Sequence, residues 1–263
     1  MNKNKDIYLS LHGVHKKFGK DLHSSLRYGV GDVLAKGFGI QKDYSVLRKN
    51  EFWALKDINF ELKRGEVLSL VGHNGSGKTT LMRLISGIYG LENGKIEKRA
   101  GLKMTTLFAL AMGLHPLLSG RENAYLKGAF FGMSKAEIDE KMEFILDFSG
   151  LKDFIDAPFG NYSSGMKARL VLTVAFATEP DVFLIDEGFN FSDAEFKDKS
   201  FKWLGEQVHK HGKSIIMASH QERRIRMLTT RMLVMKRGEI KFETEDVDEG
   251  ILFYKGQSKI LKN

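Results

Sequence analysis

Hydrophobic and polar positions follow two patterns along the chain from Ala54 onward. Short apolar runs, typical of strands, alternate with longer segments whose apolar positions recur every three or four residues, as in helices. The pattern predicts strands at Ala54–Leu62, Glu66–Val71, Gly94–Lys98, Lys103–Phe108, Asp181–Ile185, Ser214–Ala218 and Arg231–Lys236. It predicts helices at Lys78–Ile88, within Gly120–Gly150, and at Lys167–Ala177, Asp193–His211 and Gln221–Thr229. This alternation indicates an α/β fold with a largely parallel sheet.

Two regions add detail to this pattern. Ser134 is followed three residues later by Glu137, which is the spacing of a helix capping box. Residues 19–50 do not follow the alternation, yet their apolar side chains lie on one helical face, and four glycines weaken that helix by ~1 kcal/mol each relative to alanine. The apolar face consists of Leu22, Leu26, Val30, Val33, Leu34 and Phe38.

The charge of the chain is concentrated at its start. Lys and Arg number 41 and Asp and Glu 33, for a net charge of +8. Residues 1–50 hold 10 of the basic and 4 of the acidic side chains, and therefore +6 of that charge. Such an excess attracts nucleic acid or anionic lipid, or simply forms a solvated face.

Composition excludes several classes of protein. Hydrophobic residues make up 42% and charged residues 28%, the balance of a globular protein rather than a disordered or fibrous one. No stretch approaches the ~18 apolar residues of a membrane span, and the basic N-terminus lacks the apolar segment of a secretory signal. The absence of cysteine excludes disulfides and thiolate metal sites.

A phosphate-binding loop follows the apolar strand Val67–Val71. The sequence GHNGSGKTT fits the pattern G-x-x-x-x-G-K-[ST] between a strand and a helix. Glycines let backbone N–H groups face phosphates, Lys78 adds a charge for the β- and γ-phosphates of ATP, and Thr79 offers a hydroxyl to Mg²⁺. This segment is called the phosphate loop from here on. Its predicted ATP-binding residues are Gly72, His73, Asn74, Gly75, Ser76, Gly77, Lys78, Thr79 and Thr80.

A buried acidic strand end lies further along the chain. The sequence DVFLIDE describes a strand buried on both faces that delivers Asp186 and Glu187 at its carboxyl end, where ligands bind in open α/β sheets. One carboxylate is expected to organise Mg²⁺ and its neighbour to act on water.

Together with these motifs, the sequence YSSGMKARL at Tyr162–Leu170 resembles the signature of ATP-binding cassette (ABC) transporter ATPases. A hydroxyl and a glycine at a helix start form a second anion-binding end. The resemblance implies that this signature faces the γ-phosphate bound by a second subunit. The signature residues that are expected to contact nucleotide are Ser163, Ser164 and Gly165.

The resemblance also implies roles for single residues. Glu187 is the expected catalytic base, and His220, after the strand Ser214–Ala218, the expected γ-phosphate sensor. Asp193 matches an aspartate that links the two nucleotide sites, and Asp186 joins Thr79 as a Mg²⁺ ligand. The adenine is expected to stack on Phe18, with Trp53 as the alternative.

Two departures from the family pattern stand out. The family has a glutamine between the core and the helical block, but Leu102–Gly120 contains none, so the residue that replaces it stays open. Gln221 stands where an aspartate commonly follows the histidine.

The family fold is a RecA-like P-loop NTPase core with a mostly parallel sheet, an antiparallel β edge and an inserted helical subdomain. The expected core comprises about 1–106 and 165–245, and the helical subdomain about 107–164. A basic amphipathic insertion covers about 19–50, and a short C-terminal tail about 246–263. The whole is interpreted as one nucleotide-binding domain.

Four segments resemble the ATPases that export polysaccharides such as O-antigen, capsule or teichoic acid. This resemblance implies a homodimer bound peripherally to a membrane permease at the cytoplasmic face of the cytoplasmic membrane, with a lipid-linked glycan as the transported substrate. An anionic lipid contact fits the basic insertion, and no nucleic acid partner is expected. Alternatives are export of another amphipathic substrate or a soluble non-transport ABC ATPase. The segments are Glu51–Leu62, Gly113–Leu126, Tyr162–Leu170 and Ser192–Phe196.

Overall fold

The computed structural model describes residues 6–21, 46–108, 113–186 and 194–257, together with residues 23, 26, 28, 30, 34, 37 and 38. The chain forms two compact units. Unit 1 comprises Met1–Arg64, Leu68–Ala100 and Ala218–Asn263, and unit 2 comprises Gly65–Val67 and Gly101–Met217. Within the described residues, no helix is both long and apolar enough to cross a membrane.

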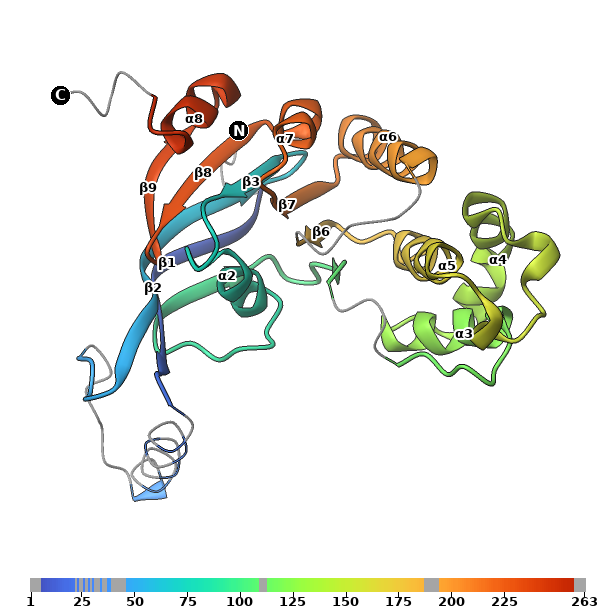
Figure 1. Ribbon diagram of the computed structural model, residues 1–263, viewed down its shortest axis with the longest axis horizontal. Helices are drawn as coiled ribbons and strands as arrows, with labels where there is room; N and C mark the ends of the chain where they lie inside the picture. The colour runs from blue at the N-terminus through green and yellow to red at the C-terminus, as the bar shows by residue number, and fades with distance from the viewer. Residues whose placement is uncertain are drawn as a thin grey trace. The chain divides into compact units, whose positions relative to one another are not determined.

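Unit 1 contains an antiparallel sheet with the strand order β2-β1-β4, formed by β1 (Ile7–Gly19), β2 (Glu51–Lys63) and β4 (Asn93–Lys98) (Figure 1). Alternate side chains of β2, from Ile58 to Leu62, are buried, as expected for a strand with one face on the core. The β1–β2 ladder runs from the Ile7–Lys63 pair to the Gly19–Glu51 pair.

A second layer of unit 1 carries the phosphate loop. Strand β3 (Val67–Val71) enters this unit at Leu68 and pairs in parallel with β8 (Arg231–Lys236), which pairs antiparallel with β9 (Glu239–Thr244). Helices α2 (Lys78–Ile85), α7 (Glu222–Leu228) and α8 (Val247–Tyr254) complete the layer. Its core is formed by Val71, Ile225, Met232, Val234 and Ile251.

Unit 2 contains three parallel strands in the order β5-β6-β7. Strands β6 (Val182–Ile185) and β7 (Ser214–Ala218) are buried along their whole length, which matches the continuous apolar runs expected of parallel strands covered on both faces. The third strand is β5 (Met104–Thr106), and α6 (Ala194–His211) connects β6 to β7.

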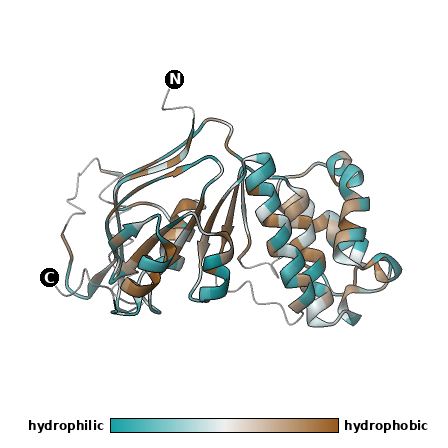
Figure 2. Cartoon of the chain, turned by 90° about the horizontal axis from the view of Figure 1, so that it is seen from above, coloured by the Kyte–Doolittle hydropathy of each residue, from teal (hydrophilic) through white to brown (hydrophobic). Residues whose placement is uncertain are grey.

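The rest of unit 2 is a helical block of α3 (Gly120–Phe130), α4 (Lys135–Ser149) and α5 (Ser164–Ala177), with short 3₁₀ turns at Lys152–Phe154 and Phe159–Asn161. The three helices lie side by side around one apolar cluster (Figure 1). The helices carry both hydrophobic and hydrophilic residues (Figure 2). Helices α3 and α4 bury one face and expose the other, whereas α5 is buried continuously from Leu170 to Ala177.

The expected α/β fold, with parallel strands, an antiparallel sheet and a helical block, is confirmed. The expected strand at Arg231–Lys236 has the observed bounds, and Ser134 and Glu137 form the predicted capping box. The proposed core and helical-subdomain boundaries at 107 and 165 remain a prediction.

Several elements differ from the expectation, among them α5, α8 and β9. Helix α5 begins at Ser164 rather than at Lys167, because the Ser163 hydroxyl caps it by accepting a hydrogen bond from the Met166 amide. The region expected to be a C-terminal tail contains α8, which Asp246 caps. Strand β9 was not among the expected strands; it pairs with β8 across the turn at Arg237 and Gly238.

Candidate functional site

The phosphate loop joins the buried strand β3 to α2 within unit 1. Gly75 and Gly77 adopt φ angles of 79° and 107°, in the left-handed region that glycine enters without a steric penalty. A Cβ atom on Gly77 would lie 2.8 Å from the carbonyl oxygen of Ala54, whereas one on Gly75 would meet open space. Gly77 is therefore required both by its conformation and by its close approach to β2.

Lys78 lies inside the loop and is only 5% exposed. Its Nζ donates hydrogen bonds to the carbonyl oxygens of Gly72, at 2.7 Å, and His73, at 3.3 Å. The ammonium is thus held against the loop backbone. A phosphate bound in this loop would be the natural partner for that charge.

The loop also contains an orphaned hydroxyl. The Oγ of Ser76 is buried and has no hydrogen-bond partner among the described residues. A buried polar atom without a partner is costly, and a bound ligand is one way to satisfy it. The glycine cradle, the lysine and this hydroxyl form a donor set that fits an anion.

The N-terminus of α2 adds to this donor set. Its N-cap residue, Gly77, offers no side-chain hydrogen bond, and its first turn holds no acidic residue. The first amide groups of the helix are therefore left for an anion, and the helix dipole favours negative charge there. Thr79 is exposed in this turn, so its hydroxyl is accessible to a metal ion, while Thr80 is half-buried.

The turn between β8 and β9 supports the loop from one side, which the sequence analysis did not anticipate. The Gly238 amide donates to the carbonyl of Ser76 at 2.9 Å, and the Lys56 amide donates to the carbonyl of Gly238 at 2.8 Å. Because these contacts join residues far apart in the chain, no local pattern beyond the Arg-Gly turn signal indicates them.

His220 also lies in unit 1, next to the start of the loop. The Ser219 amide donates to the carbonyl of Leu70 at 3.3 Å, so the residues after β7 run beside the end of β3. The Ser219 hydroxyl then accepts from the Gln221 amide at 3.1 Å, which fixes the turn around the exposed His220. This position fits the expected phosphate sensor.

The two candidate adenine-stacking residues lie on β1 and β2. Phe18 is half-buried and contacts Tyr89 and Phe52, with ring centroids 5.4 Å and 6.4 Å away. Trp53 packs edge-on against His15 at 5.4 Å. Neither arrangement selects one aromatic over the other, so Phe18 stays a prediction with Trp53 as its alternative.

Unit 2 holds the acidic strand end and the signature. Asp186 directly follows β6 and is half-buried. The expected base Glu187 and the expected linking residue Asp193 lie outside the described residues. Among the residues described, no group of three or more His, Cys, Asp or Glu side chains is placed to hold a metal ion. A hydroxyl such as that of Thr79 and a carboxylate such as that of Asp186 are the oxygen ligands that Mg²⁺ takes beside substrate phosphates.

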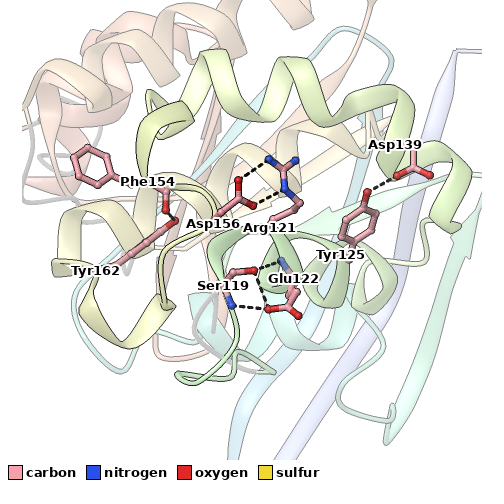
Figure 3. A network of polar contacts seen from close by, with 8 residues as sticks. All are labelled: Ser119, Arg121, Glu122, Tyr125, Asp139, Phe154, Asp156 and Tyr162. Carbon is pink, nitrogen blue, oxygen red and sulfur yellow. Dashed lines mark hydrogen bonds and ion pairs between the residues drawn. The ribbon is translucent and has the colours of Figure 1, made fainter.

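The signature lies at the start of α5, and its first residue, Tyr162, is held in place by a hydrogen bond (Figure 3). The Tyr162 hydroxyl donates to the carbonyl of Phe154 at 2.7 Å, and burial, followed by the charge of Asp156, raises the pKa of this phenol. A Cβ atom on Gly120 would collide with that hydroxyl. Ser163 and Ser164 are exposed beyond this anchor, with Gly165 half-buried behind them, and the first turn of α5 carries no acidic residue.

The anchor belongs to a polar network across the helical block (Figure 3). Arg121 donates two hydrogen bonds to Asp156, at 2.7 and 3.1 Å, and this interaction lowers the pKa of the Asp156 carboxyl. Ser119 and Glu122 form a capping box at the start of α3, and Tyr125 donates to Asp139. These contacts fix the loops that present the signature.

Comparison with known proteins supports this assembly of motifs. Residues 55–190 match the family model described as "ABC transporter". The chain is 40% identical over 194 residues to ABC transporter protein AbcA of Aeromonas salmonicida, covering 74% of this chain and 62% of that protein. It is 40% identical to teichoic acids export ATP-binding protein TagH of Lactococcus lactis, covering 73% of this chain and 41% of that protein. The chain thus spans less than two thirds of the length of these two relatives.

A third relative is covered more fully. The O-antigen export system ATP-binding protein RfbB of Klebsiella pneumoniae is 34% identical over 199 residues, covering 76% of this chain and 78% of that protein. Among solved structures, the dimeric ATP-binding cassette MJ0796 with ADP and phosphate superposes with a TM-score of 0.67 at 22% identity, covering 90% of this chain and 97% of that one. An ATP-binding subunit of an ABC transporter superposes with a TM-score of 0.71 at 20% identity, covering 96% and 95%. By its motifs, fold and relatives, the chain belongs to the ABC transporter family.

Proposed function

We propose that the chain is the ATP-hydrolysing subunit of an ABC exporter that moves a lipid-linked polysaccharide across the cytoplasmic membrane, working at its cytoplasmic face. The observation that carries the ATPase assignment is the phosphate loop, with its glycine cradle, buried lysine and uncapped helix start. The substrate class is supported by the relatives named for teichoic acid and O-antigen export.

ATP with Mg²⁺, when bound, would supply the phosphoryl group that is transferred to water. Lys78 and the α2 amides would hold the phosphates, and Thr79 and Asp186 would be the ligands of the metal ion. Glu187 accepts the proton of the attacking water, and His220 holds the terminal phosphate in place. This division of roles makes positioning and charge stabilisation the main contribution of the chain.

Assembly into a homodimer is part of the proposal. The chain holds one phosphate loop and one signature helix, and the family arrangement opposes these motifs from two subunits. A head-to-tail pair with two-fold symmetry would complete two nucleotide sites, with Asp193 linking them. The solved structure of MJ0796, a cassette of the same fold, is dimeric.

We further propose that the helical block receives a cytoplasmic helix of a membrane permease. Its surface exposes large apolar side chains, including Leu117 at 83% and Phe130 at 60%. Large exposed apolar side chains are available to pack against a partner. Nearby Leu114 packs against the core of the block, so Leu117 rather than Leu114 is available to a partner.

The basic insertion at about 19–50 is proposed to contact the permease or anionic lipid headgroups. Its described apolar residues at four-residue spacing are exposed: Leu26, Val30, Leu34 and Phe38, at 56–81%. An apolar stripe with basic neighbours suits the headgroup layer. Leu22, Val33, Arg27, Lys36 and Lys42 lie outside the described residues.

The catalytic proposal is tested with two variants of the full chain. Glu187→Gln is expected to keep ATP affinity and to lower turnover by roughly 10²–10⁴-fold, the usual range for a general base. Lys78→Ala is expected to weaken ATP binding itself by roughly tenfold or more. Steady-state ATPase assays and nucleotide titration separate the two effects. Near-normal turnover in Glu187→Gln would refute the assigned base.

The permease contact is tested by Leu117→Asp. A charge on this exposed side chain is expected to abolish co-purification with a six-span membrane subunit while leaving nucleotide affinity and the melting temperature unchanged. Leu91→Asp, at a leucine of unit 1 that is 40% exposed, is the matched control and should retain the complex. A complex of normal yield with Leu117→Asp would exclude this surface as the docking site.

A further inference from the structure

A cavity of about 730 Å³ lies in unit 1 on the side of the phosphate loop next to α8. Its walls are the end of β8, the β8–β9 turn, the C-terminal half of α8, and His73 of the phosphate loop. The volume falls in the range of sites that enclose small ligands. Of its lining residues, only His73 belongs to the proposed nucleotide site.

The lining of the cavity is strongly basic. Lys236, Arg237, Lys241 and Lys255 line it, against the single carboxylate of Glu239. Lys241 pairs with Glu239, which also lies 3.6 Å from Lys56, and Lys255 pairs with Glu222 at 2.6 Å. Neither Lys236 nor Arg237 makes an ion pair or a side-chain hydrogen bond within the described part of the chain. Two cations without partners thus line a cavity that has an excess of positive charge.

Arg237 occupies a conformation that its residue type disfavours. Its φ is 52° and that of Gly238 is 80°, so both central residues of the two-residue β8–β9 turn are left-handed. Asn, Asp or Gly is the usual residue at such a position, because other side chains are strained there. The turn alone therefore does not explain an arginine, and a side chain retained at a strained position points to a role beyond the turn.

Aromatic rings connect the cavity to the phosphate loop. The Tyr254 ring lies 5.0 Å from the His73 ring, and both residues line the cavity. Phe253, a further lining residue, stacks on Phe242 at 4.5 Å. A planar ligand ring, or the C–H face of a sugar ring, can pack on such faces while the charged end of the ligand reaches the cations. A ligand that displaces the Tyr254 ring would therefore also displace His73, which belongs to the phosphate loop.

We propose that this cavity binds an organic phosphate that carries a ring, with the phosphate on Lys236 and Arg237 and the ring against Tyr254. Sugar phosphates and nucleoside monophosphates share this chemistry. Because Tyr254 contacts His73, occupancy of the cavity changes the affinity of the phosphate loop for nucleotide, and nucleotide changes the affinity of the cavity by the same factor. The site is independent of the reaction proposed above and persists if the transported substrate is different.

Calorimetric titration of the full chain in saturating ADP and Mg²⁺ tests the proposal, since the phosphate loop is then filled. Glucose 1-phosphate and uridine 5′-monophosphate are the two probes, and inorganic phosphate and glucose are the comparisons. At least one probe is expected to bind roughly threefold to tenfold more tightly than inorganic phosphate, the contribution of one aromatic contact. Which probe binds more tightly identifies the ring.

Variants place the binding in this cavity. Lys236→Gln combined with Arg237→Asn is expected to lower probe affinity roughly tenfold or more. Asparagine tolerates the left-handed turn, so this variant should melt no lower than the parent chain. Lys202→Gln combined with Lys210→Gln, at two exposed lysines of α6, is the charge-matched control and should change nothing. Tyr254→Ala should reduce probe affinity to that of inorganic phosphate and remove the effect of the probe on ADP affinity.

Three results would overturn the proposal. These are the absence of binding by both probes, equal binding of inorganic phosphate, and unchanged probe affinity in the Lys236→Gln, Arg237→Asn variant. An ADP affinity that the better probe does not alter would refute the link through His73.

Discussion

Helices in the nucleotide motifs and helices in the helical block begin in opposite ways. In α3 and α4, a serine and a glutamate of the first turn satisfy the open amides in full capping boxes. Helix α2 starts with Gly77 and no side-chain cap, and α5 starts with Ser163 alone; neither has an acidic residue in its first turn. The capping boxes stabilise α3 and α4, whereas the positive N-terminal ends of α2 and α5 remain available for an anion.

The comparison shows how to distinguish the two uses in one chain. A glutamate at the third helical position satisfies amides and cancels the dipole, and both effects exclude a phosphate. Because Ser119, Ser134 and Ser163 all cap helices, serine by itself does not identify an anion site. The residue three positions after the serine distinguishes the two kinds of helix start. It is Glu122 in α3 and Glu137 in α4, but Met166 in α5.

The largest expected effect is a loss of folding stability when the N-cap glycine of α2 is replaced. Gly77→Ala forces a side chain into a left-handed conformation and places its Cβ 2.8 Å from Ala54. The strain costs about 1–2 kcal/mol and the overlap about 1–3 kcal/mol more. Urea unfolding measures the loss. Gly75→Ala has the same left-handed backbone in open space, so it should cost only the first part; equal losses would show that the contact with β2 is unimportant.

The sharpest test converts one class of helix start into the other. Met166→Glu gives α5 the capping box of α4, and the new carboxylate sits where the signature should meet a phosphate. Stability is expected to change by less than about 1 kcal/mol, while ATPase activity falls roughly tenfold or more. Met166→Gln is the matched control, because glutamine completes a capping box without charge. Equal activity of the two variants would show that the start of α5 meets no anion.

The smallest expected effect is a pH dependence of the capping boxes. Hydrogen bonds from the Ser134 amide and hydroxyl lower the pKa of Glu137 below its usual value of 4.5, and Ser119 does the same for Glu122. Since the folded pKa is depressed, the stabilisation is present above pH 4.5 and is lost as the pH falls through the folded pKa. The urea midpoint of the parent chain should therefore approach that of Glu137→Gln between pH 6 and pH 3. A difference in urea midpoint between the two proteins that stays constant from pH 6 to pH 3 would contradict the depressed pKa of Glu137.

Much of the site was predictable because its signals are local. The phosphate loop needs glycines at fixed spacing between a strand and a helix, and Ser134 with Glu137 forms a contiguous capping pattern. The sequence pattern predicts the start of α5 three residues late, because Ser163 fits the signature motif as well as an N-cap. Local sequence shows which residue types are present, but not which role each one takes.

The supports of the site depend on contacts between distant segments and could not be predicted. Gly238 reaches the phosphate loop from 162 residues away, and Tyr162 meets Phe154 only once the helical block has folded. The pairing of Tyr254 with His73 likewise requires α8 to fold back over β8 and β9. No periodicity within one element encodes such meetings.

The two-residue turn at Arg237 and Gly238 bears on protein engineering. Hairpin tips are usually the first choice for inserting a tag or a fluorescent label. Here, the backbone of Gly238 lies between β2 and the phosphate loop, bonded to both, and even a methyl group on it would lie 2.6 Å from the carbonyl oxygen of Ala54. An insertion at this tip would therefore separate two walls of the nucleotide site. The turn at Gly132, which is exposed and has open space around it, is the better position for a reporter.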